Sequence, residues 1–291
     1  MGPPRTGSQS EQRIEMSASP TRSDAGYTLR VNELSKSHGS SVALSAVSFD
    51  IREGEILGVI GPSGSGKTTL LRCIDLLDIP DSGSIEYFGQ LRLSRSGIGE
   101  PPRILNLEHA HDGDITEDNL RCVRRNVGLV FQNFNLWEDK TVLENLILAP
   151  VVVARMDCKT AERKAKDLCG RFELEHRIQA HAWQLSGGER QRVSILRALM
   201  MEPKLMLLDE VTSALDPLLT FSVMKAIAQL RDQGLSMIVV THHLEFASSL
   251  CDRLLYLENG KVIQIAAPAD FRRAPATERV RDFLKVLQAT G

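Results

Sequence analysis

The sequence contains no uninterrupted apolar stretch long enough to cross a bilayer and no surplus of charge of either sign. Its formal net charge is −2, so it lacks the basic field that nucleic-acid-binding proteins present to phosphates. Internal repeats are also absent. Any association with a membrane must therefore depend on a partner or on a surface contact.

Paired cysteines are missing as well. The chain has five cysteines, an odd number with scattered spacing and no C-x-x-C pair. This pattern is typical of reduced structural thiols in a cytosolic protein. The residues are Cys73, Cys122, Cys158, Cys169 and Cys251.

We expect neither a signal peptide at the start of the sequence nor a regulatory domain at its end. The first 25 residues are rich in Ser, Pro, Gly, Arg and Glu and have no apolar h-region, so we expect a disordered tail over 1–26 rather than a signal peptide. One ordered domain is expected over 27–291. The stretch 266–291 is too short for a separate regulatory domain.

The remaining composition, 42% hydrophobic and 25% charged, is that of an ordinary globular protein. Short apolar runs bounded by glycine or polar residues predict buried strands at Ile56–Ile60, Leu205–Leu208 and Ser236–Val240. Helical patterns alternate with them, which indicates an α/β fold with a mainly parallel core sheet. Strands are also expected over 28–34 and 42–51, and a hairpin around Asn259-Gly260.

Two regions interrupt this alternation. Residues 91–123 are polar and contain Pro101-Pro102, and we expect an irregular surface insertion there. Residues 132–202 have helical patterns, notably at 141–172 and 189–201, and we expect an inserted helical subdomain.

The segment Gly61–Thr68 matches G-x-x-x-x-G-K-[ST], with an apolar strand before it and a helix after it. Glycines allow backbone N–H groups to converge on phosphate oxygens, and the positive N-terminus of the helix points at the same place. Lys67 would contact the β- and γ-phosphates, and the Thr68 hydroxyl would ligate Mg²⁺. A glycine-rich turn that holds a lysine by chance would not have both the strand and the helix.

Two acidic residues follow the strand at Leu205–Leu208. Asp209 would stand at the carboxyl end of this strand, where parallel sheets bind ligands, and is a candidate Mg²⁺ ligand. Glu210 faces another direction and is a candidate general base for a water attacking the γ-phosphate. Two acidic residues at the end of a strand could simply be solvated and have no function. The complete phosphate-binding motif at Gly61–Thr68, the P-loop, argues against that interpretation.

A second small-residue turn opens a helix at Leu185–Arg192 and offers a second anion-binding N-terminus, with Ser186 as its N-cap. A single mononucleotide site does not need two anion-binding helix N-termini, one after the P-loop and one at Leu185–Arg192. Head-to-tail pairing of two copies, with the Ser186 loop of each closing the P-loop of the other, accounts for both.

With these motifs the chain resembles the ATP-binding subunits of ABC transporters from about Leu29 to Leu284. The resemblance implies an antiparallel β subdomain beside the core sheet, a homodimer, and ATP and Mg²⁺ as substrate and cofactor. It implies catalytic roles for Glu210, Gln132 and His242, with Gln132 also on the metal, and nucleotide contacts from Asp216 in the loop after Glu210. The implied nucleotide-binding residues are Gly61, Pro62, Ser63, Gly64, Ser65, Gly66, Lys67, Thr68, Thr69, Ser186, Gly187, Gly188 and His38.

Some positions depart from the family pattern. His38 stands where an aromatic residue often stacks on adenine, and Val211 replaces a proline after Glu210. Ala182 stands where a proline often precedes the turn at Leu185–Arg192 in this family. His243 is adjacent to His242, and by family position we expect it to be structural.

The stretch Phe131–Trp137, followed by Thr141–Asn145, resembles the importers of polar amino acids. This resemblance implies transmembrane permease subunits as partners, an external solute-binding protein as an indirect one, and a peripheral location on the cytoplasmic face of the membrane. Because of this resemblance we expect Phe134, Leu136 and Trp137 to anchor a permease helix; the alternative is that they are core residues of the helical lobe.

Other functions share parts of this pattern. ATPases of exporters and of lipoprotein-extracting complexes carry the same catalytic motifs, so this alternative stays open. Chromosome-structuring types need a long coiled coil and ribosome-acting types usually need two cassettes, and the sequence has neither. A catalytically dead cassette is disfavoured because Lys67, Asp209, Glu210 and His242 are intact.

Overall fold

The computed structural model describes residues 26–107, 111–213 and 215–290, and the tail expected over 1–26 therefore lies outside them except for Gly26. The strands are β1 (Tyr27–His38), β2 (Ser41–Arg52), β3 (Ile56–Ile60), β4 (Ser82–Tyr87), β5 (Leu91–Arg95), β6 (Arg103–Asn106), β7 (His111–Asp114), β8 (Val127–Val130), β9 (Leu205–Asp209), β10 (Ser236–Val240), β11 (Arg253–Glu258) and β12 (Lys261–Ala266). The helices are α1 (Lys67–Ile74), α2 (Glu117–Asn126), α3 (Val142–Val152), α4 (Cys158–Arg171), α5 (Gly187–Leu199), α6 (Pro217–Asp232), α7 (Leu244–Leu250), α8 (Pro268–Arg273) and α9 (Glu278–Thr290).

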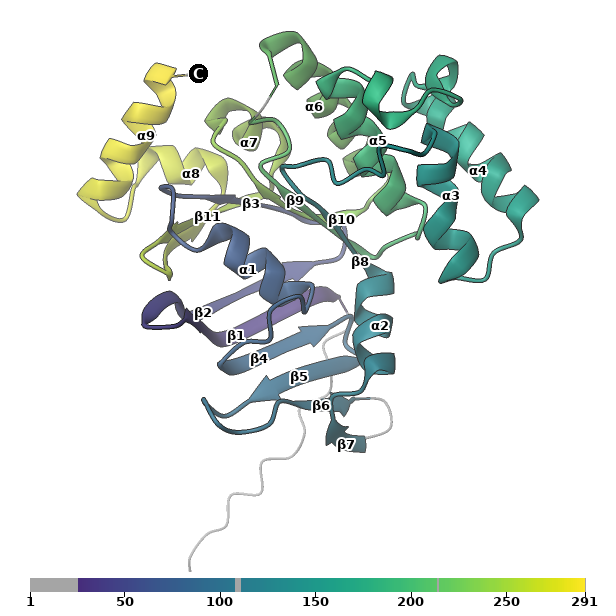
Figure 1. The fold of residues 1–291 in the computed structure, drawn as a ribbon. Helices are drawn as coiled ribbons and strands as arrows, with labels where there is room; N and C mark the ends of the chain where they lie inside the picture. The colour runs from purple at the N-terminus through teal and green to yellow at the C-terminus, as the bar shows by residue number, and fades with distance from the viewer. Residues whose placement is uncertain (1–25, 108–110, 214, 291) are drawn as a thin grey trace, which may run out of the picture.

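The core sheet has the order β12-β11-β3-β10-β9-β8. Its strands from β11 to β8 are parallel, and β12 joins antiparallel to β11. The hairpin between them turns at Asn259 and Gly260, whose φ angles of 48° and 72° suit an Asn-Gly turn. The α/β fold with a mainly parallel sheet, predicted from the sequence, is confirmed (Figure 1).

The second sheet is antiparallel and has the order β2-β1-β4-β5-β6-β7. Its outer strands come from residues 91–123, where the sequence predicts an irregular surface insertion. That expectation of irregular structure is wrong: the segment forms β5, β6, β7 and the beginning of α2. The alternating pattern Leu91-Arg92-Leu93-Ser94-Arg95, with Leu93 fully buried, provides the apolar face on which this extension packs.

Helix α1 lies between the two sheets (Figure 1). Its residues Leu70, Leu71 and Ile74 belong to a buried cluster that includes residues of β1, β2, β3 and β10. The hydroxyl of Tyr87, on β4, donates to the Ile74 carbonyl at 2.8 Å at the end of this helix. The antiparallel sheet thus supports the helix that begins at the P-loop.

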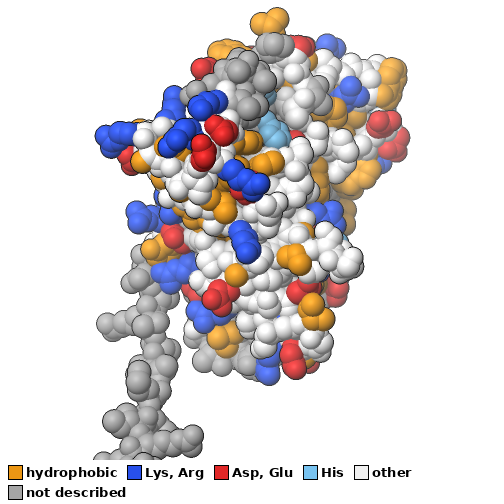
Figure 2. Space-filling view, turned by 90° about the vertical axis from the view of Figure 1, so that its left-hand side faces the viewer, with side chains coloured by type: hydrophobic (Ala, Val, Ile, Leu, Met, Phe, Trp, Pro, Cys, Tyr) orange, Lys and Arg blue, Asp and Glu red, His pale blue; other side chains and the backbone are white. Residues whose placement is uncertain are grey.

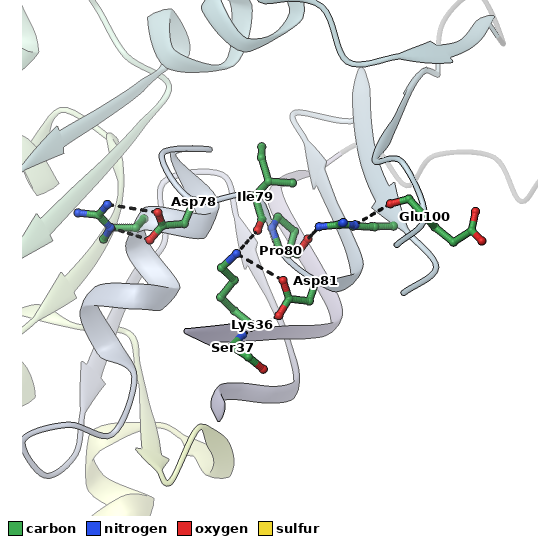
Figure 3. Close-up of polar contacts among 9 residues, drawn as sticks. Lys36, Ser37, Asp78, Ile79, Pro80, Asp81 and Glu100 are labelled. Carbon is green, nitrogen blue, oxygen red and sulfur yellow. Dashed lines mark hydrogen bonds and ion pairs between the residues drawn. The ribbon is translucent and has the colours of Figure 1, made fainter. Parts of the chain in front are cut away.

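The loop after α1 is tied to both neighbouring elements (Figure 3). Lys36 Nζ on β1 donates to the Ile79 carbonyl at 2.7 Å and to Asp81 at 3.4 Å. Asp81 also accepts from the backbone N–H of Ser37 at 2.7 Å, and Asp78 pairs with Arg72 of α1. These contacts fix the C-terminal end of α1 against β1.

Helices α3, α4 and α5 form a lobe beside the parallel sheet (Figure 1). The lobe shares one buried cluster with α6 and α7, which cover the face of that sheet opposite α1. In the described part of the chain, no helix has both the length and the apolar character needed to cross a membrane. The face shown in Figure 2 mixes Lys, Arg, Asp and Glu among apolar side chains, as the small net charge predicts.

Candidate functional site

The turn between β3 and α1 is shaped by close backbone approach. Gly61 has φ 154°, and a Cβ there would overlap the Leu257 carbonyl oxygen. Gly66, the N-cap of α1, has φ 104°, and a Cβ there would overlap the Ala43 carbonyl oxygen. Only glycine satisfies both the left-handed φ and the missing space. The backbone that the structure forms here therefore requires the two glycines of the predicted P-loop.

Lys67 is the first residue of α1 and its side chain is only 5% exposed. Its ammonium donates to the carbonyl oxygens of Gly61 at 3.0 Å and Pro62 at 2.9 Å. Glu210 Oε1 lies 3.9 Å away. Burial lowers the pKa of Lys67, and the charges of Glu210 and Asp209 partly oppose this. The positive charge is thus held inside the loop where phosphate oxygens would arrive.

Asp209 ends β9 and is 5% exposed. Burial raises its pKa, and a hydrogen bond from the Thr68 hydroxyl opposes that rise. Among the described residues, Asp209 Oδ1 is buried without a hydrogen-bond partner. A buried oxygen without a partner is costly unless something binds it, and beside a threonine hydroxyl it suits a hard cation such as Mg²⁺.

Glu210 follows at the end of β9, with φ 48°. Its Oε1 lies 2.7 Å from Nε2 of His242, the second residue after β10. The hydrogen bond to His242 lowers the pKa of Glu210, and burial partly opposes it. The structure therefore places an ionised carboxylate beside Lys67 and joins it to an imidazole. These three residues come from three separate parts of the chain.

The contact between Glu210 and His242 should make a pH-dependent contribution to the stability of the fold. Because the folded-state pKa of Glu210 lies below its ordinary value of 4.5, the pair stabilises the fold above that pH. This contribution disappears as pH falls through the lowered pKa. We expect the difference in melting temperature between the wild type and His242→Ala to be present in buffers above pH 4.5 and to vanish in strongly acidic buffer. A difference that is the same at every pH would contradict the pairing.

A cavity of 260 Å³ opens beside the P-loop. It is lined by Ser41, Val42, Ala43, Ser63, Gly64, Gly66, Lys67, Thr68, Thr69 and Glu210. The wall formed by residues 41–43 of β2 was not predicted from the sequence. Val42 is 61% exposed there, an apolar surface next to a phosphate-binding loop. Such a residue could have been suspected only from its place just after the β1–β2 turn.

Three residues of the P-loop do not line the cavity but make contacts that hold the loop in place: Gly61, Pro62 and Ser65. The first two hold Lys67 through their carbonyls, and the Ser65 carbonyl accepts from Gly260 N–H at 3.0 Å. The hydroxyl of Ser65 is buried without a partner among the described residues.

Several predicted residues do not line this cavity. His38 is exposed at the end of β1, and Gln132 is exposed in the loop after β8. His243 is also exposed, and it precedes α7 without capping it through its side chain. Asp216 caps α6, where it accepts from Leu219 N–H at 3.0 Å. Their assigned roles, and that of Asp216 in particular, stay predictions.

The second helix N-terminus is well formed. Ser186 caps α5 in a capping box with Glu189, and Ser186 itself is exposed. A Cβ at Gly188 would lie 2.8 Å from Leu219, and one at Gly187 would lie 3.2 Å from Leu215. The small residues therefore allow α5 to pack closely on α6. Ser186, Gly187 and Gly188 are not among the residues that line the P-loop cavity of their own chain.

A larger cavity, of 760 Å³, lies at the other edge of the core sheet. Pro203, Lys204, Leu235 and Ser236, which precede or begin β9 and β10, line it. It contains none of the P-loop residues, and parallel sheets bind ligands at the opposite, carboxyl ends of their strands. The smaller cavity is therefore the candidate site.

Comparison with known proteins agrees with this geometry. Residues 44–213 match the family model described as ABC transporter. The chain is 39% identical over 259 residues to the arginine transport ATP-binding protein ArtM of Bacillus subtilis (strain 168), covering 88% of this chain and 98% of that protein. It is 38% identical to the histidine/lysine/arginine/ornithine transport ATP-binding protein HisP of Escherichia coli (strain K12), with 88% and 96% covered.

A solved structure is similar as well. It is a dimeric post-hydrolysis state of the ATP-binding cassette MJ0796 bound to ADP and Pi, with a TM-score of 0.67 and 32% identity. The alignment covers 82% of this chain and 98% of that one.

Proposed function

The chain belongs to the ABC transporter family as an ATP-binding, ATP-hydrolysing subunit, and we propose that it drives the uptake of polar amino acids through a membrane permease. The observation that carries the enzymatic part is the convergence of Lys67, Asp209, Glu210 and His242 at one edge of the parallel sheet. The relatives are named for transport of arginine, histidine, glutamine and cystine, which supports amino acids as the substrate class.

In the proposed reaction, the γ-phosphoryl group of ATP is transferred to water. Glu210 accepts the proton of the attacking water, and its lowered pKa keeps it ionised at neutral pH. His242 orients this carboxylate through the 2.7 Å contact and would donate a hydrogen bond to the γ-phosphate. Lys67 exchanges the carbonyls of Gly61 and Pro62 for phosphate oxygens.

Thr68, Asp209 and Gln132 would hold the metal. Mg²⁺, when bound, neutralises charge on the β- and γ-phosphates. The partnerless Oδ1 of Asp209 supports this assignment, and the exposed Gln132 would have to approach from the loop after β8.

We propose that the site is completed by a second copy of the chain. Ser186 and the N-terminus of α5 do not line the cavity of their own chain. A helix N-terminus of this kind can bind an anion, and Ser186 is exposed to a partner. The similar MJ0796 cassette is described as dimeric. In the dimer, Ser186, Gly187, Gly188 and Asp216 of one copy would face the P-loop of its partner.

The permease is expected to dock on a hollow between the core sheet and the helical lobe. This cavity of 330 Å³ is lined by Leu77, Phe131, Trp137 and Met201 among others. Trp137 is 40% exposed and Leu77 is 42% exposed, so apolar surface is open to a partner helix. Such docking places the subunit on the cytoplasmic face of the membrane as a peripheral protein.

Two matched variants test which side chain contacts the adenine ring of ATP. Val42 lines the cavity and His38 does not, so we expect Val42→Ser to weaken ATP affinity about fivefold, the loss expected for one buried aliphatic contact. His38→Ala should change it less. Isothermal titration calorimetry with ATP and ADP measures both. A greater loss for His38→Ala would instead support stacking on histidine.

The proposed function is tested on the complex purified with its membrane partners and reconstituted in vesicles. ATPase activity is measured with a panel of amino acids and the matching solute-binding protein. Stimulation by a polar amino acid, together with its uptake, is the expected result. An ATPase coupled to export or lipoprotein release instead would leave the hydrolytic chemistry standing and overturn the substrate and the direction.

A further inference from the structure

The loop that carries Gln132 connects β8 to α3 and runs past α5 (Figure 1). Its middle part, residues 134–137, is held on two sides by helices of the lobe. One side is held by arginines of α5 and the other by an asparagine of α3. Residues 131–133, at the start of the loop, lie between these contacts and the core sheet.

On the α5 side, Arg197 makes three contacts with the loop. Its guanidinium donates to the Asn135 carbonyl at 2.6 Å and to the Phe134 carbonyl at 3.4 Å. It also lies 5.1 Å from the centre of the Trp137 ring. Seven residues earlier, on the same face of α5, Arg190 lies 5.2 Å from the ring of Phe134.

On the α3 side, the fully buried Asn145 holds the backbone of Trp137. Its Oδ1 accepts from Trp137 N–H at 2.9 Å and its amide donates to the Trp137 carbonyl at 3.0 Å. Asn135, between the two attachments, has φ 51°, so the chain bends where Arg197 holds its carbonyl. Residues 134–137 are therefore held by side chains of the helical lobe.

Resting on the proposed function, we propose that Arg197 is a positioning residue that makes the Gln132 loop move together with α5. Helix α5 begins at the Ser186 cap, which in the proposed dimer faces the partner's nucleotide. A shift of the lobe must then be absorbed by residues 131–133, so Gln132 lies at the hinge. Permease docking beside Trp137 and nucleotide closure at Ser186 are linked through this one helix.

Lysine cannot replace this arginine. A guanidinium can donate to two carbonyls and stack on an aromatic ring at the same time, whereas an ammonium lacks the planar fork. Burial lowers the pKa of Arg197, but the side chain keeps its charge in a protein. Arg197→Lys thus retains charge and most of the stem while removing the geometry of the clamp.

The test uses the complete transporter in vesicles and the isolated subunit side by side. Arg197→Lys is compared with the wild type and with Arg171→Lys, an exposed arginine of α4 that pairs only weakly with Asp167 at 3.9 Å. Three quantities are measured: melting temperature, basal ATPase of the isolated subunit, and ATPase of the transporter stimulated by amino acid and binding protein.

We expect Arg197→Lys to keep the basal rate within about twofold and to lose stimulation by about tenfold, the loss expected for a hydrogen bond to a charged group. Arg171→Lys should change neither. Full stimulation in Arg197→Lys overturns the proposal, and so does an equal fall of both rates, which indicates a purely structural role. If the wild type itself is not stimulated, the proposed function fails and the positioning role fails with it.

If Arg197→Lys does not fold, Asn135→Pro tests the same contact from the loop side. Proline cannot adopt the φ of 51° found at this exposed position, so the carbonyl held by Arg197 must move. Loss of stimulation with a retained basal rate supports the clamp, and normal stimulation overturns it.

Discussion

Replacement of Glu210 by glutamine should lower the ATP turnover rate by about 10²–10⁴-fold, the contribution typical of a general base. Glutamine has the same shape and can still contact His242, but it cannot accept a proton from water. Affinity for ATP should remain within about threefold, because Glu210 is assigned to the water and not to the phosphates. A steady-state ATPase assay and a nucleotide-binding titration measure the two quantities.

The same variant should trap the closed dimer. If two copies close around ATP and only hydrolysis reopens them, Glu210→Gln should elute as a dimer in the presence of ATP and Mg²⁺ and as a monomer without them. Glu245→Gln, an exposed residue of α7, is the matched control and should behave as the wild type. Normal turnover in Glu210→Gln would remove Glu210 from the role of base.

The parts of this molecule that depend on local sequence were predictable. Apolar runs bounded by polar residues predicted β3 and β10 with their observed bounds, and the spacing of Gly61–Thr68 predicted the P-loop between a strand and a helix. Such elements are encoded by neighbouring residues. The acids at the end of β9 were predictable for the same reason.

Features that depend on long-range pairing were not predictable. Residues 91–106 add β5 and β6 to a sheet begun by β1 and β4, and a polar segment gives little local evidence of such partners. The cavity wall at Val42 is visible only when β2 stands beside the P-loop. The clamp of Arg197 on Asn135 joins residues 62 positions apart through a backbone carbonyl, which has no sequence signature.

Lys67 is the residue whose loss should affect nucleotide binding most. In the structure its ammonium is held by two carbonyls of the P-loop and by a carboxylate at 3.9 Å, so it is oriented before any phosphate arrives. Preorganisation of this kind saves the cost of ordering a long side chain on binding. Phosphate oxygens then replace neutral carbonyls with stronger, charge-assisted partners.

Lys67→Ala should therefore weaken ATP binding by about 10–100-fold, which corresponds to about 1.5–3 kcal/mol for a hydrogen bond to a charged group. Lys67→Arg keeps the charge, but its larger planar head does not fit a site that leaves the lysine side chain 5% exposed, so we expect a similar loss. Melting curves without nucleotide separate this effect from misfolding. Unchanged affinity in a folded Lys67→Ala would mean that the glycine-rich loop binds phosphate through its backbone and α1 alone, and the role of Lys67 would have to be assigned to another cation.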